Sequence, residues 1–402
     1  MSGMSNRSSA LAARVLDAVR AVLAEPPVPL HAPVFRGKEA EFLMECLDST
    51  FVSSVGPFVD RFERMLAKTT GAAHVVAVVN GTAALHVALR LAGVGAGDEV
   101  IVPALSFIAT ANAVAYCGAV PHFVDSEERT LGLDPGKLAE HLEQTAEMED
   151  GTLRNRHTGR PIRAVVPVHV FGHPARMEEI RHVAEAFGLA LVEDAAEALG
   201  STRGGRHAGT FAPLGCLSFN GNKIITTGGG GAILTDDADL ARHARHLTTT
   251  AKLDHPWEYR HDEIGYNYRM PNINAALGCA QLAELPGMLV SKRALHRAYV
   301  EAFRDIDEVT VVEEPEDCRS NYWLQALLLD GAYSDERDAL LEALNAAGYM
   351  SRSVWGLLSD QAPYRACPRM DLSTAHSLAR RIVNIPSGVG ISRSSRGGIF
   401  SL

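Results

Sequence analysis

The sequence has few of the features that mark specialised classes of protein. Only six cysteines occur in 402 residues, and no two stand in a C-x-x-C arrangement. In a chain of this length, such scattered cysteines predict reduced thiols in the cytoplasm, and neither a disulfide framework nor a metal site is expected. Aromatic residues make up 6% and charged residues 21% of the chain, whereas 47% is hydrophobic. This composition is typical of a globular protein with a large core and excludes disorder.

Positive charge is also scarce. The 38 lysines and arginines are outnumbered by 48 aspartates and glutamates, which gives a formal net charge of −10. Such a chain has no general attraction for nucleic acid or a membrane surface, so local groups must hold any anionic ligand. No run approaches the ~20 apolar residues that span a bilayer, and the N-terminus lacks a secretory signal. Apolar residues at helical spacing instead predict an amphipathic helix that ends before Pro26: Leu11, Val15, Val19 and Val22.

Strand-like and helix-like segments alternate from residue 73. Helical segments are predicted at 82–92, 107–117 and 174–187, and each ends at a glycine. The alternation predicts an α/β fold with a large, mostly parallel seven-stranded sheet, in which ligands bind at the carboxyl ends of the strands. The apolar runs that predict the strands, buried on both faces, are 74–79, 98–103, 120–125, 164–171, 189–194, 215–219 and 231–236.

The pattern changes after residue 271. Two helical stretches separated by Pro286 lead into a smaller α/β unit, with a strand at 323–329 and a helix at 335–347 whose N-cap is Ser334. The two stretches are 272–285 and 287–305. We therefore expect three parts: an N-terminal helix and arm (1–30), a large domain (31–280) and a smaller C-terminal α/β domain (281–402).

Residues suited to one particular chemistry follow four of the predicted strands. They supply a carboxylate, a lysine, an aromatic ring and small residues at the start of a helix, where backbone amides bind phosphate. Pyridoxal 5'-phosphate needs all four, because it requires a Schiff-base lysine, a carboxylate at its ring nitrogen, a stacking partner and a phosphate site. The positions are Asp194 in LALVED, Lys223 in SFNGNKIITTGGGG, Phe107 after DEVIVP, and Gly81, Thr82 and Ala83 after HVVAVV.

In this hypothesis Lys223 has two tasks. It forms the Schiff base with the cofactor's aldehyde, and it then moves a proton between two carbons of the imine as general base and acid. Structural alternatives stand beside these roles. Asp194 could cap the AAEALG segment, and Phe107 could belong to the core. Glu197 could face the cofactor or be exposed, and His169 in VHVFG is equally well explained as a buried hydrogen-bonded histidine or as a residue lining the site.

Longer strings resemble one enzyme family. In order along the chain they are NGTAALHVALRLAGVGAGDEVIVPALSFIATANAV, VPVHVFGHPARM, EDAAEALGS, SFNGNKIITTGGGG and GYNYRMPNINAALGCAQL. Together they resemble the sugar-nucleotide aminotransferases of the DegT/DnrJ type, which are fold-type-I pyridoxal-phosphate enzymes. The resemblance covers residues 28 to 388, nearly the whole chain.

The resemblance implies a role for each matching position. Lys223 forms the internal aldimine, Asp194 pairs with the pyridine nitrogen, and Glu197 lies near the ring oxygen. Phe107 stacks on the ring. The phosphate is held by the amides of Thr82 and Ala83, by the hydroxyl of Ser218 and by Asn267 of the neighbouring subunit, with Arg269 close by. A homodimer with shared active sites is therefore expected.

Within the family, VPLHAPVFRGKEAEFLMECLDSTFVSSVGPFVDRFE and NGNKIITTGGGG resemble enzymes that aminate C4 of a UDP-linked 4-keto-6-deoxy-N-acetylhexosamine. These enzymes serve the bacillosamine and legionaminic acid pathways, and L-glutamate is their amino donor. This sequence departs from the family pattern at two places. It has Gly229 where many relatives have Glu, and it has Leu358-Ser359 where relatives of the subgroup have His. The candidate substrate contacts are Ser53, Ser54, His169, Tyr322, Arg352 and Trp355.

Three alternatives stand beside this reading. The first is a GDP-linked hexose C4 aminotransferase of the perosamine kind. The second is a pyridoxal-phosphate sugar dehydratase of the same fold; those relatives carry histidine in place of the Schiff-base lysine, so Lys223 argues against it. The third is a non-enzymatic scaffold, which the complete set of cofactor residues disfavours.

Overall fold

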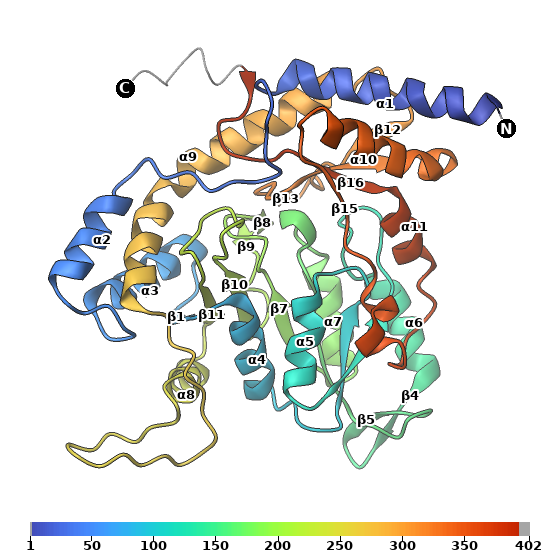
Figure 1. The fold of residues 1–402 in the computed structure, drawn as a ribbon. Helices are drawn as coiled ribbons and strands as arrows, with labels where there is room; N and C mark the ends of the chain where they lie inside the picture. The colour runs from blue at the N-terminus through green and yellow to red at the C-terminus, as the bar shows by residue number, and fades with distance from the viewer. Residues whose placement is uncertain (1, 394–402) are drawn as a thin grey trace.

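A seven-stranded sheet forms the centre of the large domain in the computed structural model, which describes residues 2–393 (Figure 1). The strand order is β1–β11–β10–β7–β6–β2–β3. All strands run parallel except β11, which pairs antiparallel with both β1 and β10. The expected mostly parallel seven-stranded sheet is confirmed. Its strands are β1 (His74–Val78), β2 (Glu99–Pro103), β3 (Val120–Val124), β6 (Ile162–Val165), β7 (Ala190–Asp194), β10 (Leu214–Ser218) and β11 (Gly231–Thr235).

Apolar clusters cover both faces of this sheet. Because successive side chains of a strand point to opposite faces, Val76 and Val78 of β1 join one cluster and Val75 and Ala77 join another. Helices α4 (Gly81–Leu91), α5 (Ile108–Tyr116) and α8 (Ala238–Thr248) contribute to the first cluster. The opposite face packs against α2 (Glu39–Asp48), α3 (Pro57–Thr70), α6 (Pro135–Thr145) and α7 (Met177–Ala186). Burial on both faces explains why the strand sequences are mostly apolar.

A single long helix connects the two parts of the molecule. The expected break at Pro286 is wrong, since α9 runs without interruption from Asn272 to Ala302 with Pro286 inside it. Leu282 and Leu285 pack under the large sheet, while Leu295 and Tyr299 pack in the smaller core. This burial at both ends offsets the hydrogen bond that a proline removes from a helix. By length and composition α9 could cross a membrane, but half of its most apolar window is buried within the protein.

The smaller unit is a four-stranded antiparallel sheet with helices against it. Its strand order is β12–β14–β16–β15. The predicted N-cap at Ser334 is wrong, because a 3-10 turn over Gly331–Glu336 precedes α10 and Asp330 accepts a hydrogen bond from Ala332 N at its start. The elements are β12 (Val309–Val311), β14 (Gln325–Leu329), α10 (Arg337–Ala346), β15 (Arg352–Ser353), α11 (Ser373–Arg381) and β16 (Ile382–Ile385).

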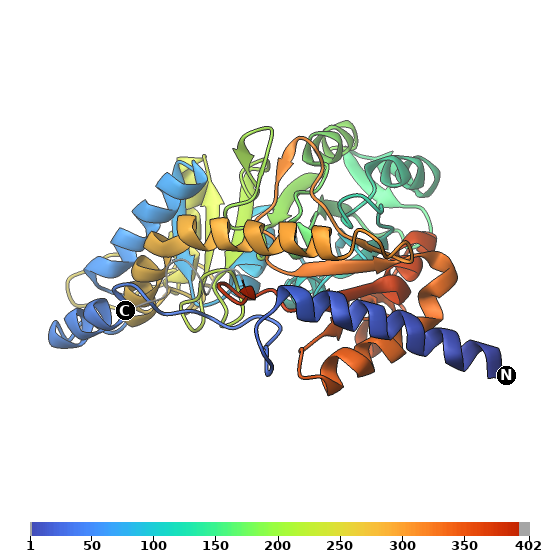
Figure 2. The same ribbon diagram turned by 90° about the horizontal axis from the view of Figure 1, so that it is seen from above.

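The predicted N-terminal helix is α1 (Ser2–Val22). Its apolar stripe, Leu11, Val15 and Val19, is buried in one cluster with α9, α10 and the four-stranded sheet. Figure 2 shows α1 lying alongside α9. The N-terminal helix is therefore packed onto the smaller unit.

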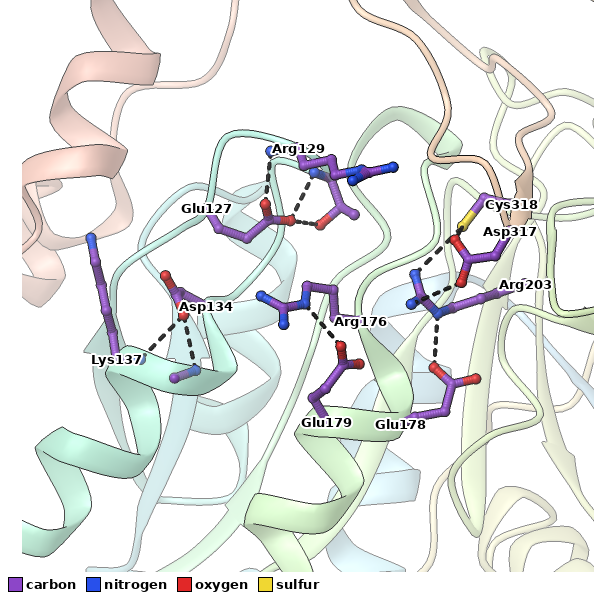
Figure 3. Close-up of polar contacts among 12 residues, drawn as sticks. Glu127, Arg129, Asp134, Lys137, Arg176, Glu178, Glu179, Arg203, Asp317 and Cys318 are labelled. Carbon is purple, nitrogen blue, oxygen red and sulfur yellow. Dashed lines mark hydrogen bonds and ion pairs between the residues drawn. The ribbon is translucent and has the colours of Figure 1, made fainter.

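Short strands join the smaller unit to the large domain. β13 (Cys318–Arg319) pairs with β8 (Thr202–Arg203), which pairs with β9 (Arg206–His207). Arg203 stabilises this connection, because its guanidinium forms ion pairs with Asp317 at 2.9 Å and with Glu178 at 2.8 Å (Figure 3). A separate hairpin, β4 (Ala146–Glu149) and β5 (Thr152–Asn155), lies before β6.

Candidate active site

Lys223 lies on the loop that follows β10, with only 12% of its side chain exposed. Its Nζ is 3.3 Å from Oε1 of Glu197 and 3.8 Å from the centre of the Trp323 ring. Glu197 is held in turn, since its Oε2 accepts a hydrogen bond of 2.9 Å from Phe171 N. Burial raises the pKa of Glu197, and Lys223 and the Phe171 amide act against this rise. The predicted lysine is thus a sheltered amine whose position is set by a carboxylate and an indole ring.

Asp194 ends β7 and lies at the same edge of the sheet, paired with Cys216 of β10. Its carboxylate is buried and accepts from two neutral donors, Thr110 Oγ1 at 2.8 Å and Ala196 N at 3.2 Å. Burial raises the pKa of Asp194, although these hydrogen bonds and the charge of Lys223 oppose the rise. Lys223 bonds Glu197 rather than Asp194. A buried carboxylate is stabilised by a cation beside it, and the protonated ring nitrogen of pyridoxal phosphate fits this requirement.

His169 is a buried, fully bonded histidine. Its Nε2 lies 2.9 Å from Oε2 of Glu193, and its Nδ1 accepts a hydrogen bond of 3.0 Å from Ala175 N. Glu193 also accepts from the amides of Gly209 and Ala212. Because both ring nitrogens of His169 are used inside the protein, the structural alternative for this residue describes it better than the substrate contact.

The start of α4 provides the expected anion site in a modified form. The side chain of Asn80 caps the helix and accepts from Ala83 N at 2.7 Å, so the Ala83 amide is already engaged. The amides of Gly81 and Thr82 have no acceptor within the helix, because a helix leaves its first donors unpaired. A Cβ on Gly81 would lie 2.8 Å from Cβ of Ser218, so glycine brings the Ser218 hydroxyl up to these amides. Unpaired amides at a helix start beside a hydroxyl are typical of phosphate sites.

Phe107 precedes α5 and leaves 52% of its surface exposed. Its ring meets Trp355 at 6.4 Å, and Trp355 packs at 5.1 Å on Phe171, whose amide holds Glu197. Trp355 therefore joins the aromatic surroundings of the site rather than the core of the smaller unit alone. The exposed face of Phe107 is available to a flat ring.

Asn267 and Arg269 lie differently from each other. The Arg269 guanidinium is buried and bonded at 2.9 Å both to Glu63 and to the carbonyl oxygen of Ala77. It therefore anchors its own segment to β1 and α3. Asn267 is exposed and pairs with Thr249, so it lies at the base of the loop between α8 and α9. This loop stands out from the body in Figure 1. Three large apolar side chains of this loop are 79%, 83% and 85% exposed: Trp257, Tyr259 and Ile264.

The remaining substrate candidates are spread around this region. Ser53 and Ser54 lie on a loop pinned by the first residue of α9, because Asn272 donates to Phe51 O at 2.7 Å and its own amide donates to Ser53 O at 2.6 Å. Tyr322 is buried and stacks on His296 at 3.8 Å, which removes it from the site. Arg352 is exposed on β15.

The Leu358-Ser359 pair is buried. The amide of Leu358 donates to Ala104 O at 2.9 Å, so the segment packs against the end of β2. Leu358 and Ser359 therefore pack this segment against the large domain.

Sequence reasoning missed several residues that complete the site. Trp323 faces Lys223, where the sequence suggested its neighbour Tyr322, and its Nε1 donates to Asn222 O at 2.6 Å. Asn321 ties the two units together by donating to the carbonyl oxygens of Glu197 and Leu199. The string SNYW could have indicated these two residues, since it places the amide of Asn321 and the indole of Trp323 just before a buried strand.

Comparison with known proteins agrees with this geometry. Residues 34–398 match the DegT/DnrJ/EryC1/StrS aminotransferase family. The chain is 37% identical over 370 residues to GDP-perosamine synthase of Caulobacter vibrioides, covering 92% of this chain and 95% of that protein. It is 36% identical to the putative pyridoxal phosphate-dependent aminotransferase EpsN of Bacillus subtilis, covering 93% and 94%. The crystal structure of DesI with its TDP-sugar product superposes with a TM-score of 0.78 at 32% identity, covering 91% and 88%.

Proposed function

The chain belongs to the DegT/DnrJ/EryC1/StrS family of pyridoxal-phosphate-dependent sugar aminotransferases, and we propose that it transfers the amino group of L-glutamate to C4 of a GDP-linked 4-keto-6-deoxyhexose. The observation that carries the aminotransferase assignment is the sheltered Lys223 beside Glu197, with the buried Asp194 at the same sheet edge. The choice of GDP rests on the GDP-perosamine synthases of Caulobacter vibrioides and Escherichia coli, which are 37% and 36% identical to the chain.

This proposal corrects the preference reached from the sequence alone. The strings VPLHAPVFRGKEAEFLMECLDSTFVSSVGPFVDRFE and NGNKIITTGGGG favoured a UDP-linked N-acetylhexosamine of the bacillosamine and legionaminic acid pathways, but the relatives named above support the perosamine alternative. The motifs at Lys223 and Asp194 serve chemistry that the whole family shares, so they carry no information on the nucleotide.

Pyridoxal 5'-phosphate supplies a conjugated, protonated ring that makes a proton on the carbon bearing the amine removable. The chain's own residues do the rest. Lys223 Nζ would be the attachment point, and it would carry the proton between the substrate carbon that bears the amine and the aldehyde carbon of the cofactor. Glu197 orients that amine, and Asp194 holds the positive ring nitrogen. Gly81, Thr82 and Ser218 hold the phosphate.

We also propose a homodimer whose two active sites are shared. The support is the exposed Asn267 on a loop carrying three exposed apolar residues, which a partner subunit would cover. All six cysteines are free thiols, which fits the reducing cytoplasm where nucleotide sugars are made.

A substrate panel tests the proposal. The purified enzyme is mixed with L-glutamate and with GDP-, UDP- or dTDP-linked 4-keto-6-deoxy sugars, and 2-oxoglutarate and amino sugar are measured. We expect the GDP-linked sugar to give the highest kcat/KM. A UDP-linked N-acetyl sugar turned over faster would restore the first preference, and loss of water without glutamate consumption would identify a dehydratase.

A further inference from the structure

The projecting loop between α8 and α9 carries two carboxylates that meet histidines of α8. Asp262 Oδ1 lies 2.6 Å from Nε2 of His246, and Glu263 Oε1 lies 2.9 Å from Nε2 of His243. Glu263 Oε1 is also 3.8 Å from Nε2 of His246. The two histidines stand three residues apart in α8, so they lie on one side of the helix. Two imidazoles and two carboxylates therefore gather where the loop adjoins α8 (Figure 1).

Backbone hydrogen bonds place the two carboxylates at the helix. Leu253 N donates to Arg260 O at 2.8 Å, which joins the outgoing half of the loop to its returning half. Tyr266 N donates to Leu247 O at 2.7 Å, which ties the returning half to the end of α8. Both carboxylates belong to the stretch between these contacts. The backbone alone therefore brings them together beside the histidines.

The charges of this cluster are not balanced by a cationic side chain. Within the described residues 2–393, Asp262 and Glu263 form ion pairs with histidines and with no lysine or arginine. Neighbouring carboxylates repel each other, and a neutral imidazole supplies no charge against this repulsion. A divalent cation would neutralise both carboxylates at once and would accept the lone pair of an imidazole nitrogen.

The donor atoms are spaced as the ligands of one metal ion. Nε2 of His246 and one oxygen each of Asp262 and Glu263 all lie within 4.8 Å of one another. Ligands bound at about 2.0–2.2 Å to a tetrahedral Zn²⁺ lie about 3.3–3.6 Å apart. The separations of 2.6 and 3.8 Å at His246 fall on either side of this range, and small rotations of these partly exposed side chains would reach it. The scattered cysteines predicted no metal site, but this cluster uses no cysteine.

We propose that His246, Asp262 and Glu263 bind one divalent transition-metal ion, with Zn²⁺ as the best fit, and that the ion fastens the returning half of the loop to α8. One imidazole and two carboxylates are ligands that Zn²⁺ accepts, and water takes the fourth position. His243 positions Glu263, because ligating carboxylates in metal sites are commonly hydrogen-bonded by a further side chain. The inference concerns the loop and does not depend on the proposed function.

Zinc titration of the tag-free holoenzyme tests the site. The protein is treated with a chelator, freed of it, and titrated with ZnCl₂ in competition with a chromophoric chelator. We expect one Zn²⁺ per chain. His246→Ala should weaken binding by about 100-fold or more because a ligand is lost, and His243→Ala by about 10- to 100-fold because Glu263 loses its partner. His182→Ala, at an exposed histidine of α7, is the matched control and should bind like the wild type.

Proteolysis measures whether the ion holds the loop. Lys252 and Arg260 are exposed within it, so trypsin can cut after either residue. Zn²⁺ should slow both cuts in the wild type and in His182→Ala but not in His246→Ala, as followed by mass spectrometry of the fragments. Absence of saturable binding, binding unchanged in His246→Ala, or equal cleavage of the wild type with and without Zn²⁺ overturns the inference. Turnover of glutamate and keto sugar is measured separately, so each of these results leaves the proposed function standing.

Discussion

At Lys223 two side chains decide what the ammonium group can do. Glu197 draws the amine toward one side, the Trp323 ring supports it from another, and both partners are buried. A cation over an indole gains attraction from the ring electrons, more so where water is excluded. The amine is thus held in one place before any ligand arrives, and preorganisation of this kind lowers the cost of reaching the reactive geometry.

The first prediction concerns this amine. Lys223→Ala should abolish covalent attachment of the cofactor and lower kcat by about a thousandfold or more, because no other amine is placed to transfer the proton. Absorbance of the holoenzyme and mass spectrometry after borohydride reduction measure the attachment. Lys38→Ala, at an exposed lysine on the surface, is the control and should behave as wild type. Attachment that survives in Lys223→Ala would show that another lysine carries the cofactor.

The second prediction concerns Asp194. Because burial raises its pKa, the folded protein binds this proton more tightly than the unfolded chain does. The free energy of unfolding of cofactor-free protein should therefore fall as the pH rises from the ordinary aspartate pKa to the raised pKa of Asp194 in the folded protein. Asp194→Asn should remove this part of the pH dependence and stabilise the cofactor-free protein at pH 8.

The same substitution should have the opposite effect on the holoenzyme, because an amide cannot hold the positive ring nitrogen. We expect kcat to fall by about 100-fold or more and the stabilisation by added cofactor to shrink. Thermal midpoints of both proteins, with and without cofactor, from pH 4 to pH 8 measure this. A cofactor-free variant less stable than wild type at pH 8 would contradict the role given to burial.

At the scale of elements, the site is made by strands and a helix that approach unusually closely. β11 runs against the direction of its neighbours and starts at Gly231, where a Cβ would lie 2.5 Å from the backbone of Asn80. Asn80 caps α4, so the close approach brings the helix start to the end of β10. Backbone atoms cannot move aside as a flexible side chain can. Glycine is therefore required at this crossing.

The third prediction follows from this crossing. Gly231→Ala should lower the free energy of unfolding by about 1–3 kcal/mol through overpacking and should weaken cofactor binding, because it displaces the amides of Gly81 and Thr82. Urea denaturation and cofactor titration measure the two effects. Gly287→Ala, at an exposed helical glycine with open space around its Cβ, should instead stabilise the protein by about 0.5–1 kcal/mol. Similar behaviour of the two variants would contradict the argument.

At the scale of the whole molecule, the loop between α8 and α9 is the feature that a single chain leaves unexplained. It exposes Trp257, Tyr259 and Ile264 and carries Asn267 at its end. Large apolar groups gathered on one projecting loop are typical of an interface. A two-fold dimer would use this loop twice, so each subunit would complete the other's site.

The fourth prediction tests this sharing. Asn267→Ala and Lys223→Ala should each inactivate the enzyme, but a mixture refolded together should recover about a quarter of the wild-type activity. Half of the dimers are then mixed, and each mixed dimer holds one intact site. The measurement is activity after refolding, with each variant refolded alone as the control. No recovery, despite mixed dimers shown by mass spectrometry, would mean that each site is built within one chain.

Local sequence patterns predicted most elements of the fold but failed at particular residues. Most strand and helix positions followed from apolar periodicity, which is local, and the glycine stops agreed with the observed ends. The predicted strand 164–171 is wrong over most of its length, because β6 covers Ile162–Val165 and a 3-10 turn covers Val170–Gly172. The helix break predicted at Pro286 is wrong because burial of α9 at both ends outweighs one lost hydrogen bond. The N-cap predicted at Ser334 is wrong because Asp330 starts a 3-10 turn ahead of the helix. Local signals fail where tertiary packing supplies a larger energy than the local preference.

The sequence by itself determined that the large domain is built on a mostly parallel sheet, and it predicts Lys223 and Asp194 as cofactor residues at the carboxyl ends of its strands. Residue type and spacing carry that information, and parallel strands bring their carboxyl ends to one edge. Only the tertiary structure decided that Trp323 faces Lys223 and that Glu63 holds Arg269. These residues come from segments far apart in the chain, and their contacts depend on how α9 and the smaller unit pack, which no local pattern encodes.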